Sequence, residues 1–251
     1  MIELRDLSVT SGSFQLTNLA LVVPTGGYGV LMGSTGSGKT TILEAICGLR
    51  TIASGRVLLG GVDVTSWSVG SRGIGYVPQD AALFPTLSVW EHLALGLKLR
   101  RVGRVEIANR VAEVAEALGI AHLLKRTPHH LSGGEARRVA IGRAIAFHPQ
   151  LLLLDEPLSA LDEDHRGRLV ELLQSLHRSE RVTTLHVTHY RDEAAAVGEH
   201  FFQLTHNQIA VCERPQAGHI TRHGMANASE GNEGNIEPDT TTAQPCTDRE
   251  P

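Results

Sequence analysis

Residues 33–40 form a glycine-rich segment, Gly-Ser-Thr-Gly-Ser-Gly-Lys-Thr, whose residue types and spacing are suited to holding phosphate groups. Glycines let the backbone N–H groups of such a loop turn inward toward phosphate oxygens. Lys39 can reach the β- and γ-phosphates, and the Thr40 hydroxyl can ligate Mg²⁺. The expected nucleotide contacts are the residues of this loop and the next one: Gly33, Ser34, Thr35, Gly36, Ser37, Gly38, Lys39, Thr40 and Thr41.

The sequence on either side of this loop supports the phosphate-binding interpretation. An apolar run, Tyr28–Met32, precedes the loop, and a segment with helical periodicity follows Lys39. A strand before the loop and a helix after it are the context that the pattern requires, and the helix start favours an anion. The alternative is a flexible glycine turn, but a chance match in such a chain is on the order of one in a hundred.

Two acidic residues, Asp155 and Glu156, follow the apolar run Leu151–Leu154, which is typical of a central parallel strand. Ligands of open α/β sheets bind outside the carboxyl ends of the strands. We therefore expect Asp155 to hold Mg²⁺, directly or through water, and Glu156 to act as the general base on the attacking water. Two acids in such a place are usually solvated or cap a helix, but the upstream phosphate loop favours the catalytic interpretation.

A second glycine pair lies far from the first loop, in the segment Leu131–Glu135. Ser132 and Glu135 have the spacing of a capping box at a helix start. That interpretation does not explain Gly133 and Gly134, which weaken a helix but permit close approach of a ligand, and a helix start attracts an anion. The expected contacts are Ser132, Gly133, Gly134 and Glu135. Two phosphate-binding segments on one chain suggest a site shared between two subunits that face each other head to tail.

The alternation of strands and helices along the chain predicts an α/β fold with a mostly parallel sheet. Residues 2–9 and 14–23 are expected to form two antiparallel edge strands, and residues 201–204 and 209–212 a closing hairpin. Residues from about 86 to 148 are mostly helical in pattern, which indicates an inserted helical subdomain.

Composition excludes several classes of protein. The 251 residues carry a formal net charge of -4, which argues against a nucleic-acid protein, and the three cysteines lack the spacing of a metal site or disulfide framework. No signal pattern and no run of about 20 apolar residues is present, so we expect a soluble cytosolic chain. Residues 214–251 contain no Phe, Trp, Tyr, Leu or Val and are expected to be a disordered tail.

Taken together, these segments resemble the nucleotide-binding cassettes of ABC transporters, over about residues 1–213. The phosphate loop is similar to Walker A, Leu151–Glu156 to Walker B, and Leu131–Glu135 to the signature motif of that family. The resemblance implies a P-loop NTPase core with an N-terminal antiparallel β-subdomain and an inserted helical subdomain. It also implies an ATPase whose cofactors are ATP and Mg²⁺.

The resemblance extends to single residues. Gln79 matches the family's loop glutamine, which senses Mg²⁺ and the attacking water, and His189 matches the switch histidine that contacts the γ-phosphate. Ser159–Asp162 matches the loop that crosses the dimer interface. The sequence departs from the family after the first strand, where an aromatic usually stacks on adenine. Here residues 10–13 read Thr-Ser-Gly-Ser, and alternation directs the nearest aromatic, Phe14, toward the core.

The stretch Gln79–Leu99 is similar to that of importer cassettes, in which the Leu-Phe-Pro region contacts a membrane subunit. The resemblance implies a homodimer, peripheral on the inner face of the membrane, that works with permease subunits and indirectly with a solute-binding protein. Cassettes for molybdate, tungstate or sulfate are the most similar group. Some of these carry a C-terminal regulatory domain, which we do not expect here. The alternatives are a soluble ABC ATPase of translation or DNA repair, and a P-loop kinase or GTPase.

Overall fold

The computed structural model describes residues 1–216 except residues 13 and 160. The expected disordered tail, 214–251, therefore falls almost wholly outside the described residues, and that expectation stays a prediction.

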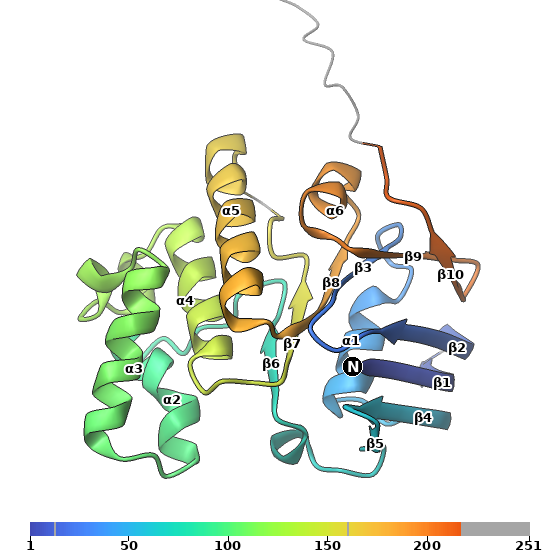
Figure 1. Ribbon diagram of the computed structural model, residues 1–251, viewed down its shortest axis with the longest axis horizontal. Coiled ribbons are helices and arrows are strands. Elements are labelled where there is room, and N and C mark those ends of the chain that lie inside the picture. The colour runs from blue at the N-terminus through green and yellow to red at the C-terminus, as the bar shows by residue number, and fades with distance from the viewer. Residues whose placement is uncertain (13, 160, 217–251) are drawn as a thin grey trace, which may run out of the picture. The chain divides into compact units, whose positions relative to one another are not determined.

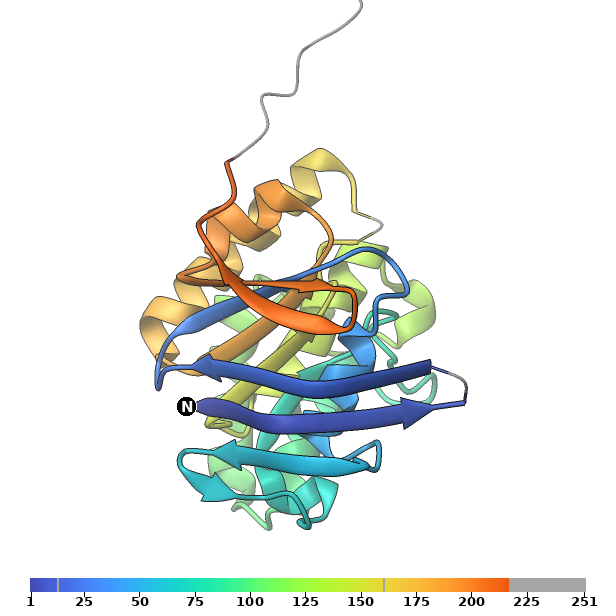
Figure 2. The same cartoon turned by 90° about the vertical axis from the view of Figure 1, so that its right-hand side faces the viewer.

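The N-terminal strands belong to a four-stranded antiparallel sheet with the order β2-β1-β4-β5 (Figure 2). Its members are β1 (Ile2–Ser11), β2 (Phe14–Val23), β4 (Ser54–Leu59) and β5 (Val62–Asp63). The expectation that both first strands are edge strands is wrong for β1, which pairs with β2 on one side and β4 on the other. Pairing with β4 depends on a contact some fifty residues away, which local alternation does not encode.

A second, six-stranded sheet has the order β10-β9-β3-β8-β7-β6. Its members are β3 (Tyr28–Met32), β6 (Ile74–Val77), β7 (Leu151–Asp155), β8 (Thr183–Thr188), β9 (His200–Thr205) and β10 (Gln208–Cys212). Every pairing is parallel except that of the closing hairpin, β9 with β10. All residues of β3, β7 and β8 are buried, because helices or the other sheet cover both faces. The mixed α/β fold expected from the sequence is confirmed.

The helix α1 (Lys39–Cys47) packs between the two sheets (Figure 1). Its apolar residues Ile42, Leu43 and Ile46 share one buried cluster with side chains of β1 and β7. The opposite face of the larger sheet is covered by α4 (Gly133–Ile145), α5 (Glu163–Glu180) and α6 (Arg191–Val197). These layers fix the carboxyl ends of β3, β7 and β8 at one edge of the sheet.

Three helices from the middle of the chain, α2 (Val89–Leu99), α3 (Arg104–Ala117) and α4, gather at one side of the molecule (Figure 1). Ser88 and Ser132 begin α2 and α4 with complete capping boxes, and Gly103 precedes α3. Within the described part of the chain, no helix combines the length and apolar character needed to span a membrane. The domain boundaries expected at 86–148 and 213 remain predictions.

Candidate functional site

The glycine-rich loop joins the carboxyl end of β3 to the start of α1 and has a conformation that requires its glycines. Gly36 and Gly38 have φ angles of 79° and 99°, in the left-handed region that other residues avoid. A Cβ on Gly33 would lie 2.8 Å from the hydroxyl oxygen of Ser37. Ser34 and Thr35 are exposed, so the loop presents its outer side to solvent. This backbone is suited to a bound anion.

Lys39 is buried under the loop, with 5% of its surface exposed. Its ammonium donates hydrogen bonds of 3.0 Å to the carbonyls of Gly33 and Ser34. It also lies 3.5 Å from a carboxylate oxygen of Glu156. The loop therefore holds one positive charge at its centre, where phosphate oxygens can share it.

Asp155 is the last residue of β7 and is only 2% exposed. One carboxylate oxygen accepts a 3.2 Å hydrogen bond from the Thr40 hydroxyl, and the other a 3.4 Å bond from the Tyr76 hydroxyl. Burial, with the nearby charge of Glu156, raises the pKa of Asp155, although Thr40, Tyr76 and Lys39 oppose the rise. A buried carboxylate beside a hydroxyl suits a hard cation such as Mg²⁺, which prefers oxygen ligands.

Glu156 is the meeting point of the predicted catalytic groups. Its backbone has a φ of 44°, and its amide donates to the carbonyl of Val187, which ties it to β8. The Gln79 amide donates to one carboxylate oxygen at 3.4 Å, and Nδ1 of His189 lies 3.2 Å from the other. The structure thus brings together Lys39, Gln79, Glu156 and His189, which come from four separate segments.

The second glycine pair, Gly133 and Gly134, lies in the first turn of α4, which begins with a capping box. Ser132 accepts a hydrogen bond from the amide of Glu135, and the Glu135 carboxylate accepts one of 2.7 Å from the amide of Ser132. The hydrogen bond from the Ser132 backbone amide to the carboxylate lowers the pKa of Glu135. Ser132 and Gly133 are exposed. Among the described residues, no hydrogen bond or ion pair connects this capping box with the phosphate loop or with Glu156.

Asp162, expected at a dimer interface, is the N-cap of α5 in this chain. It accepts hydrogen bonds from the backbone amide of His165 and lies 2.7 Å from its ring nitrogen Nδ1. Ser159 donates a 2.8 Å hydrogen bond to the carbonyl of Glu156, so the segment after the acidic pair is anchored to it. Asp162 can cap α5 and also lie at a dimer interface, so its expected place at that interface stays a prediction.

Tyr76 is a site residue that the sequence did not reveal, whereas Phe14 packs against the core as expected and has a further contact. Tyr76 reaches Asp155 from β6, the strand beside β7, and burial raises its pKa, so it stays a hydrogen-bond donor. No local signal in the sequence shows that the strand that carries Tyr76 pairs with β7. Phe14 is half-buried, and its ring would lie 2.8 Å from a Cβ on Gly38, so it contacts the phosphate loop as well as the core.

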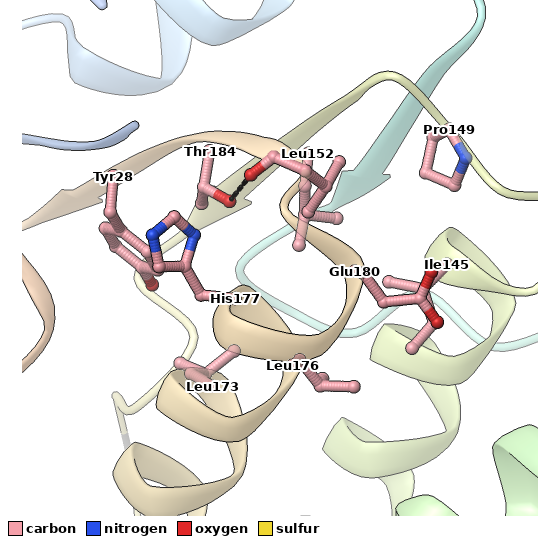
Figure 3. Close-up of a pocket in the computed structure, with 10 residues that line it drawn as sticks. Tyr28, Ile145, Pro149, Leu152, Leu173, Leu176, His177, Glu180 and Thr184 are labelled. Carbon is pink, nitrogen blue, oxygen red and sulfur yellow. Dashed lines mark hydrogen bonds between the residues drawn. The ribbon is translucent and has the colours of Figure 1, made fainter. Parts of the chain in front are cut away.

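A small pocket of about 10 Å³ lies between α5 and the larger sheet (Figure 3). Tyr28, Leu152 and Thr184, which line it, stand at the amino ends of β3, β7 and β8. The residues predicted to bind nucleotide stand at the carboxyl ends of the same parallel strands. The pocket is too small and on the wrong edge to be part of the candidate site.

Relatives with known roles are similar to this chain over most of its length. The molybdate/tungstate import ATP-binding protein WtpC of Thermococcus kodakarensis is 41% identical over 239 residues, which cover 92% of this chain and 72% of that protein. The same protein of Archaeoglobus fulgidus is 50% identical, covering 72% of this chain and 75% of that one. The sulfate/thiosulfate import ATP-binding protein CysA of Thermosynechococcus vestitus is 42% identical, covering 85% and 64%.

A solved dimeric structure of the ABC transporter cassette MJ0796 superimposes with a TM-score of 0.77 at 28% identity. The match covers 87% of this chain and all of that one. A post-hydrolysis structure of the same cassette, with ADP and phosphate bound, superimposes with a TM-score of 0.76. The sequence profile of the ABC transporter family matches residues 16–159. This chain therefore belongs to the ABC transporter family, as one of its ATP-hydrolysing cassettes.

Proposed function

We propose that this chain powers the import of an inorganic oxyanion, such as molybdate, tungstate or sulfate, through a permease in the cytoplasmic membrane. The observation that carries the proposal is the complete group around Glu156 in a chain whose relatives are import ATP-binding proteins for these anions. The chain itself would stay on the cytoplasmic side, bound to the permease, while a solute-binding protein selects the anion.

The proposed working form is a symmetric head-to-tail homodimer. Each ATP would lie between the phosphate loop of one copy and the Ser132–Glu135 turn of the other. Two features support this arrangement: Ser132 and Gly133 are exposed and form no hydrogen bond or ion pair with their own chain's Glu156 in the described part of the chain, and a structural neighbour is a dimeric cassette. A closed dimer would be favoured by ATP because ATP contacts both copies only in that state.

The proposed roles of the site residues follow from their chemistry. The residues from Gly33 to Thr41 would hold the phosphates, with Thr40, Asp155 and Gln79 as the groups for Mg²⁺. Bound Mg²⁺ would supply positive charge to the phosphate oxygens. Glu156 would take a proton from the attacking water, while Gln79 orients that water and His189 contacts the γ-phosphate.

The permease is expected to contact the Leu83-Phe84-Pro85 region. Phe84 is 50% exposed, although its backbone amide donates a hydrogen bond to Nε2 of His92. Its ring stacks against the His92 ring, with 6.0 Å between centroids, and the Arg143 guanidinium lies over it. An exposed aromatic held rigidly in this way is suited to anchor a helix of another subunit.

The test is the ATPase rate of the chain purified with its neighbouring permease and binding protein. We expect molybdate, tungstate or sulfate to stimulate hydrolysis, and unrelated solutes such as sugars or amino acids not to do so. Stimulation only by an organic solute would overturn the oxyanion assignment. Failure to co-purify with any membrane subunit, together with recovery on ribosomes, would overturn the transport role.

A further inference from the structure

Two arginines of α4 donate hydrogen bonds to the backbone of the segment that carries Gln79. Arg137 donates hydrogen bonds to the carbonyls of Pro78 and Gln79, at 2.9 and 2.5 Å. Arg143, almost two turns further along α4, donates to the carbonyls of Ala82 and Ala81, at 2.7 and 3.2 Å. The planar guanidinium fork can satisfy two neighbouring carbonyls at once, which an ammonium cannot do with the same geometry.

Arg137 is buried, where a positive charge is unfavourable in free energy. It is 6% exposed, and in the described part of the chain no carboxylate lies within ion-pair distance of it. Burial lowers the pKa of its guanidinium, against the fields of Asp80, Asp155 and Glu193. A buried cation without an ion-pair partner is destabilising unless its hydrogen bonds are satisfied, and here the carbonyls of 78 and 79 satisfy them.

The backbone of this segment, residues 78–82, includes unfavourable conformations that depend on neighbouring groups. Ala81 and Ala82 have φ angles of 61° and 38°, in the left-handed region that is unfavourable for alanine. Such conformations persist only where the surroundings impose them. The two arginines bond directly to this backbone, and Gln79 then reaches Glu156 through its side-chain amide. The position of Gln79 at the general base therefore depends on α4.

The same helix begins at the Ser132–Glu135 turn. Arg137 stands five residues after Ser132, within the continuous helical hydrogen bonding of α4. A helix moves as a rigid element over this length, so a displacement of its first turn is passed to Arg137. An anion bound at Ser132 would thus act on Gln79 of the same chain through one side chain.

We propose that Arg137, supported by Arg143, is a positioning residue that couples the two nucleotide sites of the dimer. When the ATP of one copy docks on the Ser132–Glu135 turn of the other, α4 is fixed, and Arg137 sets Gln79 against Glu156 in that second copy. Hydrolysis in each site then depends on occupation of the other. This inference rests on the proposed head-to-tail dimer.

The test compares Arg137→Met with a matched control, Arg110→Met, in the full chain. Arg110 is also buried, at 6% exposure, and also donates to two successive backbone carbonyls, those of Ile145 and Ala146. Unlike Arg137 it forms ion pairs, with Glu113 and Glu180, and none of its hydrogen bonds or ion pairs in the described part of the chain reaches the Gln79 segment. We expect both variants to lose thermal stability. Only Arg137→Met should lower kcat, by tenfold or more, with ATP affinity within twofold of wild type and a Hill coefficient that falls toward one.

A double-mutant cycle with Gln79→Ala separates coupling from general damage. If Arg137 acts through Gln79, Arg137→Met causes no further loss of kcat in the Gln79→Ala background. An equal tenfold loss in both backgrounds, or an Arg110→Met variant with the same loss of kcat, would overturn the proposal. Arg137→Gln, which keeps a neutral donor for one carbonyl, replaces Arg137→Met in the cycle where the methionine variant does not fold.

The outcome is distinguishable from failure of the shared site itself. Ser132→Arg tests the dimer without touching Arg137. If Ser132→Arg retains the wild-type rate, the head-to-tail site is wrong. If Ser132→Arg is inactive while Arg137→Met keeps wild-type kcat and cooperativity, the shared site stands and the coupling role of Arg137 is wrong.

Discussion

The group around Glu156 and the Ser132–Glu135 turn are both expected to handle phosphate, yet they are built in opposite ways. Around Glu156, an ammonium, an amide and an imidazole from separate segments lie within 3.5 Å of one buried carboxylate. At the Ser132–Glu135 turn, Ser132 and Gly133 are exposed, and in the described part of the chain the side chains of Ser132 and Glu135 form hydrogen bonds only with each other's backbone, as a helix cap. The first is assembled by the fold of one chain, whereas the second offers only a surface.

This difference has a physical reason. A catalytic carboxylate and its partners need fixed geometry before the reaction, which a preorganised core provides. A turn that engages a second molecule must keep its backbone accessible, and Gly133 has open space where a Cβ would stand. Four substitutions test this difference, two in the group around Glu156 and two in the Ser132–Glu135 turn.

Replacing the proposed base should have the largest effect. Glu156→Gln is expected to lower the rate of ATP hydrolysis by about 10²–10⁴-fold, because the amide cannot accept the proton of the attacking water. Nucleotide binding should persist, and size-exclusion chromatography with ATP should detect a trapped dimer. Turnover at the wild-type rate would rule out Glu156 as the base.

Blocking the exposed turn should have the next largest effect. Ser132→Arg is expected to lower hydrolysis by about 10²-fold or more, since the added side chain obstructs the phosphates of the other copy. Binding of ATP to the monomer, measured with a fluorescent analogue, should be unchanged because the phosphate loop is untouched. A variant that loses binding and hydrolysis together would mean that the two regions are not independent.

Removing the buried charge of Asp155 should separate stability from function. In the folded chain the pKa of Asp155 lies above 3.8, its value in the unfolded chain. Protonation of Asp155 therefore stabilises the fold in full below pH 3.8, and this contribution is lost as pH rises through the pKa of the folded state. Asp155→Asn is therefore expected to raise the Tm of the nucleotide-free chain at neutral pH by about 2–4 °C, or about 1 kcal/mol.

The same variant should lose the stabilisation that Mg²⁺ and ATP give to the wild-type chain. The advantage of Asp155→Asn without nucleotide should shrink as pH is lowered toward 4, and thermal melts at several pH values measure it. An advantage that is constant with pH would show that burial of the Asp155 charge is not its origin.

Replacing one glycine of the turn should have the smallest effect on stability. Gly133→Ala is expected to stabilise the isolated chain by about 0.5–1 kcal/mol, because alanine favours the helix and nothing obstructs its Cβ. Hydrolysis should nevertheless fall, since in the proposed dimer the methyl group would stand where the phosphates of the second copy approach. A stabilised variant with full activity would leave helix capping as the only role of the turn.

Much of the candidate catalytic centre follows from the sequence, because its residues occur at ends of recognisable elements. The spacing of Gly33, Lys39 and Thr40 specifies a loop between a strand and a helix, and the structure has that loop. The apolar run before Asp155 specifies a buried strand, so its carboxyl end can be placed. Gln79 and His189 carry no local signal of their own and came from the family resemblance.

Local sequence determined the phosphate loop, the buried strand before Asp155 and the capping box at Ser132, because each depends on residues within one turn or one strand. Only the tertiary structure decided that β1 pairs with β4, that Tyr76 bonds to Asp155, and that Arg137 holds the backbone of Gln79. These contacts join residues about 50 to 80 positions apart, and their energy comes from packing and hydrogen bonds formed only after the sheets and helices have assembled.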